Sequence, residues 1–267
     1  MPRRRIPIGT TAGRMTRARR RALRIAPAGL VVALLLPAPA WAQSCPAPLA
    51  EARRLVLVTA ESMNATAASL QRFERAAPKD PWQPLGDAEP ALVGKSGMGW
   101  SHFFRELRRG SEPVKVEGDK RAPAGVYPIG RSFGTVPSSR PGHLQIASDS
   151  VCVDDPSSPA YNTITSRAKV GPKVHAENMS RALPMYRRGL LVDYPTDGKA
   201  RAGSCIFIHV WKSPASGTAG CVSLPEARVE ALQDFSAPGA VLAILPRAAL
   251  GRLAGCLPAV AAARSGR

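Results

Sequence analysis

Short apolar runs typical of β-strands recur along the chain, and clusters of Pro, Gly, Ser and Asp separate them. The runs cover residues 54–59, 91–94, 125–129, 144–146, 189–194, 205–211 and 239–245. We therefore expect a mostly β fold, a sandwich or barrel-like sheet with a few short helices.

Helical signals are few. The clearest helix is expected over residues 224–235, because Ser223 and Glu226 have the spacing of a capping box and an apolar face follows. Two further helices have weaker sequence signals and end at Gly or Pro; they are expected over residues 100–109 and 176–183. Residues 62–75 fit either a helix or a turn between two strands.

The first 42 residues have the organisation of a secretory signal peptide. Nine arginines and no acidic residue lie between Met1 and Arg24, and an apolar stretch then runs to about Pro37. Ala40-Trp41-Ala42 has the small-x-small spacing of a cleavage site. The apolar stretch is short and broken by Pro, which disfavours the alternative of a membrane anchor. We expect translation to start at Met1 or Met15, and export to the periplasm or cell envelope with no membrane span after cleavage.

The remaining chain is expected to form one domain over residues 43–257, followed by a small, basic, disordered tail over residues 258–267. The formal net charge of +18 suggests a polyanionic partner, but half of it belongs to the leader. Without residues 1–42 the chain has 28 basic and 19 acidic residues. No concentrated basic helix or aromatic stacking motif accompanies this charge, so a nucleic-acid partner is not expected. The oligomeric state is left open.

One strand carries a histidine close to a cysteine turn. On a strand over residues 205–211, Ile206, Ile208 and Val210 share one face, and Cys205, Phe207, His209 and Trp211 share the other. Eleven residues separate His209 from Cys221, enough for a loop that returns beside the strand. Gly220 allows a tight turn with exposed amides immediately before Cys221.

This arrangement suggests a cysteine nucleophile. An imidazolium beside Cys221 would lower the thiol pKa, and the backbone amides around Gly220 could stabilise an oxyanion. The alternatives are a structural disulfide at Cys221 and a packing role for His209. Five cysteines leave at least one unpaired within the chain, which favours the catalytic interpretation.

The segment from His209 to Thr218-Ala-Gly-Cys-Val222 resembles the active-site signature of the L,D-transpeptidase (YkuD-type) catalytic domain family, in the branch with a Thr-Ala-Gly-Cys turn. Four segments carry the resemblance, which covers roughly residues 54–250: 114–127, 152–162, 177–179 and 203–222. Two departures stand out. Ala219 occupies a position where many members have histidine, and Val222-Ser223 replaces a hydrophobic residue followed by Arg or Asn. Contacts to a substrate carboxylate would then come from elsewhere, with Lys115, Lys120 and Lys212 as candidates.

The resemblance implies a mostly β L,D-transpeptidase fold, with Cys221 as nucleophile and His209 as general base and acid. It implies acyl transfer through a thioester, from a peptidoglycan tetrapeptide donor to a diamino-acid amine. Gly220 would supply an oxyanion-hole amide, and a backbone carbonyl or Ser204 would orient His209. A carboxypeptidase that hydrolyses the same bonds and a catalytically silent wall-binding module are the alternatives.

With Cys221 free, the resemblance favours the disulfides Cys152–Cys205 and Cys45–Cys256 among three possible connectivities. No cofactor or metal is expected. The other three histidines lack the spacing of metal ligands and are interpreted as surface or packing residues: His102, His143 and His175.

Overall fold

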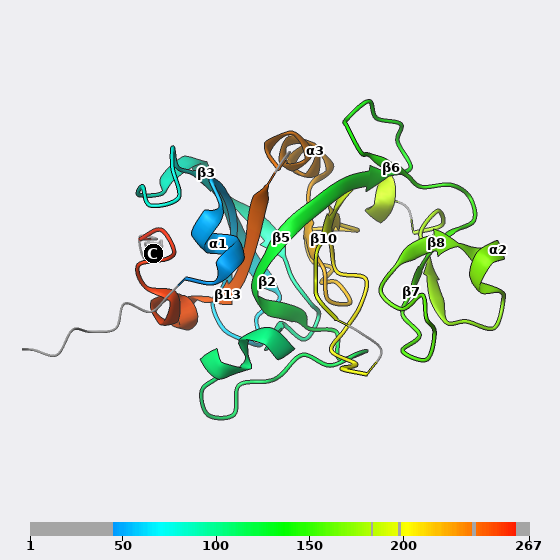
Figure 1. Cartoon of the computed structure of the whole chain (residues 1–267), viewed down its shortest axis with the longest axis horizontal. Helices are drawn as coiled ribbons and strands as arrows, with labels where there is room; N and C mark the ends of the chain where they lie inside the picture. The colour runs from blue at the N-terminus through cyan, green and yellow to red at the C-terminus, as the bar shows by residue number, and fades with distance from the viewer. Residues whose placement is uncertain (1–44, 183, 197–198, 237–238, 260–267) are drawn as a thin grey trace, which may run out of the picture. The chain divides into compact units, whose positions relative to one another are not determined.

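The main element of the fold is a closed ring of β-strands, seen in a computed structural model of the chain (Figure 1). Its strands are β1 Arg54–Ala60, β2 Ala67–Glu74, β3 Gln83–Leu92, β5 Ala122–Gly134, β10 Gly189–Val192, β11 Phe207–Val210, β12 Val222–Leu224 and β13 Ala240–Pro246. They follow the order β10-β11-β12-β3-β2-β1-β13-β5, and β5 pairs with β10 to close the ring. The prediction of a mostly β, barrel-like fold with few short helices is confirmed.

The structure describes residues 45–182, 184–196, 199–236 and 239–259. The predicted leader (1–42) and most of the predicted tail (260–267) lie outside these ranges. Within them, no helix has the length and apolar character needed to cross a membrane.

Shorter elements surround the ring. The strands β4 Met98–Trp100 and β6 Leu144–Gln145 pair with β5, and a second sheet has the order β8-β7-β9 from Ile164–Ser166, Ser150–Val153 and Ala176–Asn178. The helices are α1 Ala47–Glu51, α2 Arg167–Val170, α3 Glu226–Phe235 and the 3-10 helices η1 His102–Leu107, η2 Met185–Arg187 and η3 Arg247–Leu253. The second sheet lies at the opposite end of the ring from α1 (Figure 1).

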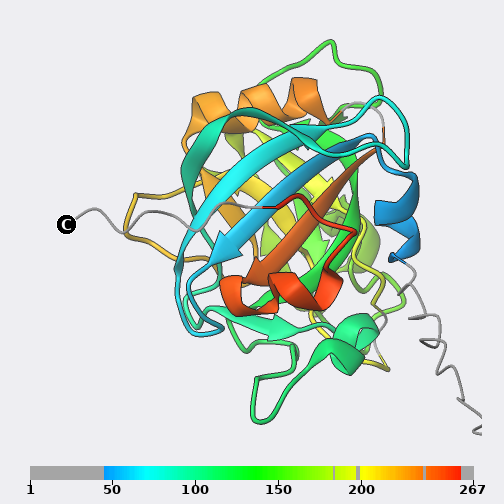
Figure 2. The same cartoon turned by 90° about the vertical axis from the view of Figure 1, so that its left-hand side faces the viewer.

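The neighbouring parallel strands β1 and β13 form part of the main core. Every residue of β13 is buried, as are Leu55–Ala60 of β1, because their nearly continuous apolar sequences are covered on both faces. Figure 2 shows η3 at the end of β13, and the segment that follows it, up to residue 259, crosses in front of these strands. A smaller buried cluster lies between the ring and the second sheet, and it contains Phe133, Tyr186, Phe207 and Cys221.

Several local predictions need correction. The helix expected over residues 176–183 is not formed by residues 176–182, the part that the structure describes: Ala176–Asn178 is β9, and its pairing with β7 outweighs the local helical signal. The helix expected over 100–109 is the shorter η1, because Trp100 belongs to β4. The ambiguous segment 62–75 is a turn followed by β2, which pairs on both sides.

The predicted capping box is also wrong. Ser223 lies in β12 and its hydroxyl has no hydrogen-bond partner, while Pro225 occupies the N-cap position of α3. The helix therefore begins at Glu226, two residues later than expected.

Both predicted disulfides are confirmed. Cys45–Cys256, with Cα atoms 5.5 Å apart, joins the segment before α1 to the segment after η3. Cys152–Cys205, with Cα atoms 6.1 Å apart, ties β7 of the second sheet to the residues immediately before β11.

Candidate functional site

His209 and Cys221 lie on and next to two neighbouring parallel strands, β11 and β12. His209 of β11 is in register with Ser223 of β12, and Cys221 immediately precedes β12. Because side chains two residues apart share a face, Cys221 lies on the same face of this strand pair as His209. Both residues line a cavity of about 530 Å³. The structure thus places the two residues predicted to form the dyad in the wall of one cavity.

The predicted alternation along residues 205–211 is confirmed for the residues that pack. Ile206, Ile208 and Val210 belong to the main core. On the opposite face, Cys205 and Phe207 join the smaller cluster that contains Cys221. The edge of the Tyr186 ring meets the His209 ring, with centroids 5.4 Å apart.

His209 is a neutral, oriented imidazole. Its side chain is almost fully buried, with 4% of the residue exposed, and burial lowers its pKa to about 4. Nδ1 lies 2.8 Å from the Val210 carbonyl oxygen, which can only accept a hydrogen bond. Nδ1 therefore carries the proton, and the Nε2 lone pair is left as the base.

The orienting group is thus a backbone carbonyl. Ser204, the other candidate for this role, instead donates its hydroxyl to Glu117 Oε2 at 2.8 Å. Glu117 also accepts from the Tyr161 hydroxyl, so Ser204 belongs to a network at the cavity wall, apart from the dyad.

Cys221 alone is free among the five cysteines, all of which the structure describes. Its Sγ donates to the Cys205 carbonyl oxygen at 3.4 Å. Burial raises the thiol pKa to about 12, and the charge of Glu177 acts in the same direction. The expectation that an imidazolium lowers this pKa is therefore wrong for the resting site, because burial disfavours the charged form of both groups.

The turn before Cys221 is organised by Thr218, whose role was not predicted. Its backbone bonds to Val93 and Lys95 on the neighbouring segment after β3. Its hydroxyl donates to the Cys221 carbonyl oxygen at 2.7 Å and accepts from the Gly220 amide at 3.1 Å. The Thr-x-Gly-Cys spacing was the available signal, since a threonine hydroxyl readily closes turns onto nearby backbone groups.

Gly220 has a φ of +155°, and a Cβ there would lie 3.1 Å from the Arg121 carbonyl oxygen. This explains the glycine, but its amide is not the free oxyanion donor we expected. The amide is already bonded to Thr218, because the turn folds back on its own side chain.

In the comparisons with known proteins, no family model, no curated protein and no solved structure matches this chain. The site is therefore interpreted from its own residues.

Positively and negatively charged side chains both line the cavity that contains His209 and Cys221. The charged lining residues are Lys95, Lys115, Lys120, Lys212, Glu117, Asp154 and Glu177. Lys115 is buried, and its Nζ bonds to Asp119 Oδ1 at 2.6 Å and to the Val116 carbonyl oxygen at 2.7 Å. Of the three lysines considered for a substrate carboxylate, Lys120 and Lys212 therefore fit the role better, because the Lys115 ammonium is already paired.

Glu177 and Tyr186 were also missed as parts of the site. The Tyr186 hydroxyl donates to Glu177 Oε2 at 2.8 Å. Burial raises the pKa of Glu177, and that of Tyr186 is raised as well. Tyr186 contacts the His209 ring, so the hydrogen-bonded pair Tyr186 and Glu177 lines the cavity beside the imidazole.

The other three histidines lie outside this cavity. His143 is 2.9 Å from Ser132 Oγ, His175 pairs with Asp154 at 2.5 Å, and His102 is exposed beside Arg105. Within the ranges described, no three His, Cys, Asp or Glu side chains are grouped so that they could hold a metal ion.

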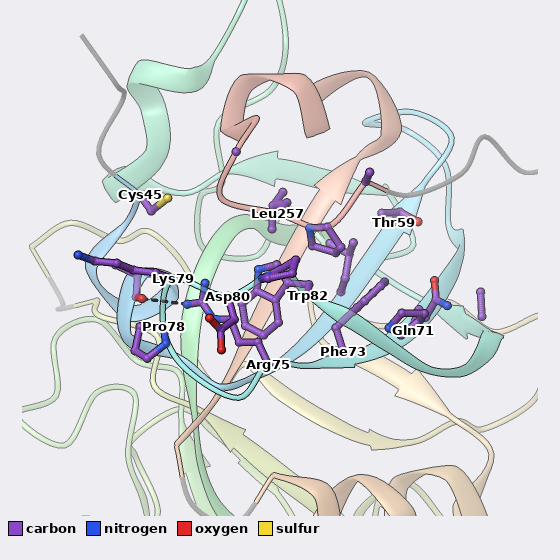
Figure 3. A pocket seen from close by; sticks show the side chains of 18 of the residues that line it. Cys45, Thr59, Gln71, Phe73, Arg75, Pro78, Lys79, Asp80, Trp82 and Leu257 are labelled. Carbon is purple, nitrogen blue, oxygen red and sulfur yellow. Dashed lines mark hydrogen bonds between the residues drawn. The ribbon is translucent and has the colours of Figure 1, made fainter.

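A larger cavity of about 1080 Å³ lies against β1 and β2 (Figure 3). In it the Arg75 guanidinium stacks on Trp82 at 4.1 Å and donates to the carbonyls of Leu49, Ala50 and Ala52. Its cysteine, Cys45, is in a disulfide, and neither His209 nor Cys221 lines it. The free thiol therefore lies in the smaller cavity.

Proposed function

We propose that this chain is an exported cysteine acyltransferase, an L,D-transpeptidase that acts on peptidoglycan stem peptides. The observation that carries the proposal is a free thiol, Cys221, in the same cavity as a neutral imidazole, His209, whose Nε2 is left as the base. The resemblance of the Thr218–Val222 turn and the segments before it supports the choice of substrate. The two disulfides are compatible with an oxidising compartment outside the cytoplasm.

In the first half-reaction, Cys221 Sγ attacks the carbonyl carbon of the third stem residue while its proton passes to Nε2 of His209. A C–S bond forms, and the tetrahedral intermediate collapses as the C–N bond to the terminal D-amino acid breaks. His209 returns the proton to the leaving amine. The products are a thioester on Cys221 and a free D-amino acid.

In the second half-reaction, the side-chain amine of another stem attacks the thioester and gives its proton to His209. The C–S bond breaks, the proton returns to the sulfur, and a peptide crosslink is formed. Water in place of the amine would give a tripeptide, which is the carboxypeptidase alternative.

The neutral resting pair supports proton transfer during attack instead of a preformed thiolate. A thiol with a pKa of about 12 holds almost no thiolate at pH 7, so a base is needed as the C–S bond forms. A neutral imidazole with a pKa of about 4 is available for this over the whole physiological range.

The test is incubation of the mature chain, residues 43–267, with disaccharide tetrapeptides, followed by mass spectrometry of products and protein. Crosslinked dimers and an acyl adduct on Cys221 are expected, and both should be absent in Cys221→Ala. His209→Gln should lose turnover, whereas the matched control His102→Gln changes an exposed histidine outside the cavity and should not. Tripeptides without dimers would indicate the hydrolase. Unchanged substrate with no adduct would refute the proposal and favour a silent module.

A further inference from the structure

The thiol of Cys221 is held by a residue with an unusual backbone. Cys205, two residues before β11, has a φ of +54°, a left-handed conformation that residues with a side chain rarely adopt. In this conformation its carbonyl oxygen accepts the hydrogen bond from Cys221 Sγ at 3.4 Å. The position of this acceptor therefore depends on what keeps Cys205 in the left-handed region.

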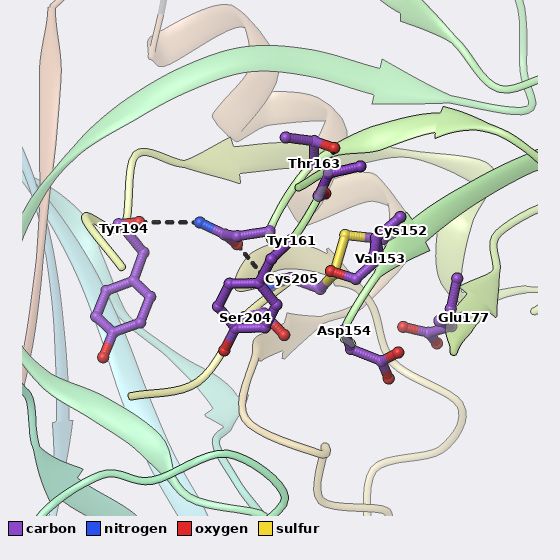
Figure 4. The surroundings of a disulfide bond; sticks show 12 residues. Cys152, Val153, Asp154, Tyr161, Thr163, Glu177, Tyr194, Ser204 and Cys205 are labelled. Carbon is purple, nitrogen blue, oxygen red and sulfur yellow. Dashed lines mark hydrogen bonds between the residues drawn. A yellow bond between two sulfur atoms is a disulfide. The ribbon is translucent and has the colours of Figure 1, made fainter. Parts of the chain in front are cut away.

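Two interactions hold Cys205 there, and both come from the region of the second sheet (Figure 4). Its side chain is bonded to Cys152 of β7. Its amide donates to Asn162 Oδ1 at 2.9 Å, and Asn162 Nδ2 donates in turn to the Tyr194 carbonyl oxygen at 3.1 Å. Asn162 itself has a φ of +60° and donates its amide to Val153.

The other end of the disulfide is firmly anchored. Cys152 is buried and lies in the central strand of the second sheet, in register with Ile164 of β8 and Glu177 of β9. Because β7 is fixed by its two neighbouring strands, the disulfide also fixes the position of Cys205, which contacts the thiol of Cys221.

We infer that the Cys152–Cys205 disulfide is a positioning element for the nucleophile: by keeping Cys205 left-handed, it aims the Cys205 carbonyl at Cys221 and fixes the rotamer of the thiol. Asn162 supports it through the Cys205 amide. The other backbone group that bonds to the Cys221 sulfur is that of Phe207, and because a thiol is a weak hydrogen-bonding group, this contact alone would hold the rotamer less firmly. The kinetic part of the test rests on the proposed function, and the labelling part does not.

The second disulfide provides a matched control. Cys45–Cys256 ties the segments next to α1 and η3, and neither of its cysteines lines the cavity of Cys221. Removing it takes away a covalent crosslink without changing a contact of the thiol.

The experiment compares three double variants of the mature chain: Cys152→Ala with Cys205→Ala, Cys152→Ala with Cys205→Gly, and the control Cys45→Ala with Cys256→Ala. Glycine adopts a positive φ without steric cost, so it can keep the left-handed backbone without the disulfide. Each variant retains Cys221 as its free cysteine, which makes labelling with iodoacetamide specific. The readouts are kcat, KM, the alkylation rate and the thermal unfolding midpoint.

The alanine pair should lower kcat by about tenfold or more with little change in KM, because a misplaced nucleophile costs rate more than binding. It should also raise the alkylation rate of Cys221 by about tenfold, because the Cys205 carbonyl no longer holds the thiol. The glycine pair should recover both to within about threefold of wild type. The control pair should match wild type in both. Equal values for the alanine pair and wild type, or equal losses in the alanine and glycine pairs, would overturn the inference.

If the alanine pair does not fold, the glycine pair still tests the inference, because a loss of about tenfold in its kcat would overturn it. Asn162→Gly tests the support from the Cys205 amide with the disulfide intact, since glycine tolerates the φ of position 162 and removes the acceptor. A decrease in kcat and faster alkylation are expected, and unchanged values of both would refute the role of Asn162. If the variants differ from wild type in alkylation rate as expected but wild type forms no acyl-transfer product, the proposed function is refuted and the positioning role of the disulfide stands.

Discussion

The Nδ1 atom of His209 lies 2.8 Å from the carbonyl oxygen of Val210, the next residue along β11. The imidazole is therefore oriented by its own strand, with no carboxylate as third member. Burial of the ring lowers the pKa of His209 to about 4, and the hydrogen bond to Val210 offsets only part of this effect. Burial therefore sets the pKa of His209, and the contact with Val210 decides which ring nitrogen is left as the base.

The first prediction concerns the pH dependence of catalysis. Protonated His209 cannot accept the thiol proton, so kcat/KM should fall on the acid side with a midpoint near pH 4 and stay flat from about pH 6 to 9. The measurement is a pH profile of kcat/KM for tetrapeptide. His102→Gln should leave the acid limb in place, and a midpoint near 6.5 would contradict the buried neutral imidazole.

The same group should affect stability. The folded-state pKa of His209 lies below the ordinary value of 6.5, so the unfolded chain binds the proton first as the pH falls. Stability is therefore lost between about pH 6.5 and pH 4, by roughly 3 kcal/mol. Urea unfolding at pH 7 and pH 4 should show a loss in wild type that is smaller by this amount in His209→Gln. Equal losses in the two proteins would contradict the prediction.

Thr218→Val should damage the turn that carries the nucleophile. The substitution keeps the shape of the side chain but leaves the Gly220 amide and the Cys221 carbonyl without the hydroxyl that joins them. We expect a loss of roughly 1–3 kcal/mol in the free energy of unfolding, and a decrease of about tenfold in kcat. Thr218→Ser restores the hydroxyl and should recover most of both. Equal effects of Val and Ser would show that the methyl group matters instead.

The sequence predicts the fold where the local and tertiary preferences agree. β1 and β13 are apolar runs that also pair with each other, and both were expected. Residues 176–178 have a helical neighbourhood in the sequence but pair with β7, and Ser223 has cap spacing but lies in β12. In both cases a partner distant in sequence decides, which local patterns do not contain.

The sequence likewise predicts some features of the candidate site and misses others. Alternation along one strand places His209 on the correct face, and the odd cysteine count points to Cys221. The sequence does not contain the depth of burial, which reverses the expected pKa shift of the thiol. It also does not show that the Gly220 amide folds back onto Thr218, because that bond depends on the final shape of the turn.

Glu112 should contribute to stability through a network away from the dyad. Its carboxylate accepts from Arg252, at 2.6 and 2.7 Å, and from Trp100 Nε1, and the Arg252 hydrogen bonds lead in lowering its pKa to about 2. A depressed folded-state pKa stabilises the protein above the ordinary value of 4.5, and this is lost as the pH falls towards 2.

Glu112→Gln should therefore cost roughly 1–2 kcal/mol at pH 7, a value reduced by solvent because the side chain is 21% exposed. The difference from wild type should shrink as the pH approaches 2 in urea unfolding experiments. The exposed Glu106→Gln serves as control, and a cost that does not vary with pH would exclude the carboxylate charge as its source.

Removal of each disulfide should affect the free energy of unfolding and kcat in different proportions. The two disulfides join residues 211 and 53 positions apart, so loop-closure entropy gives upper limits of roughly 5 kcal/mol for Cys45–Cys256 and 4 kcal/mol for Cys152–Cys205. Replacing Cys45 and Cys256 by Ala should then lower the free energy of unfolding at least as much as replacing Cys152 and Cys205. The order should be reversed for kcat, since Cys205 contacts the thiol of Cys221 and the Cys45–Cys256 disulfide lies outside its cavity. Urea unfolding and kcat measured on the same samples test both orders. If kcat instead followed stability in both variants, the disulfide at Cys205 would act on catalysis only by holding the fold together.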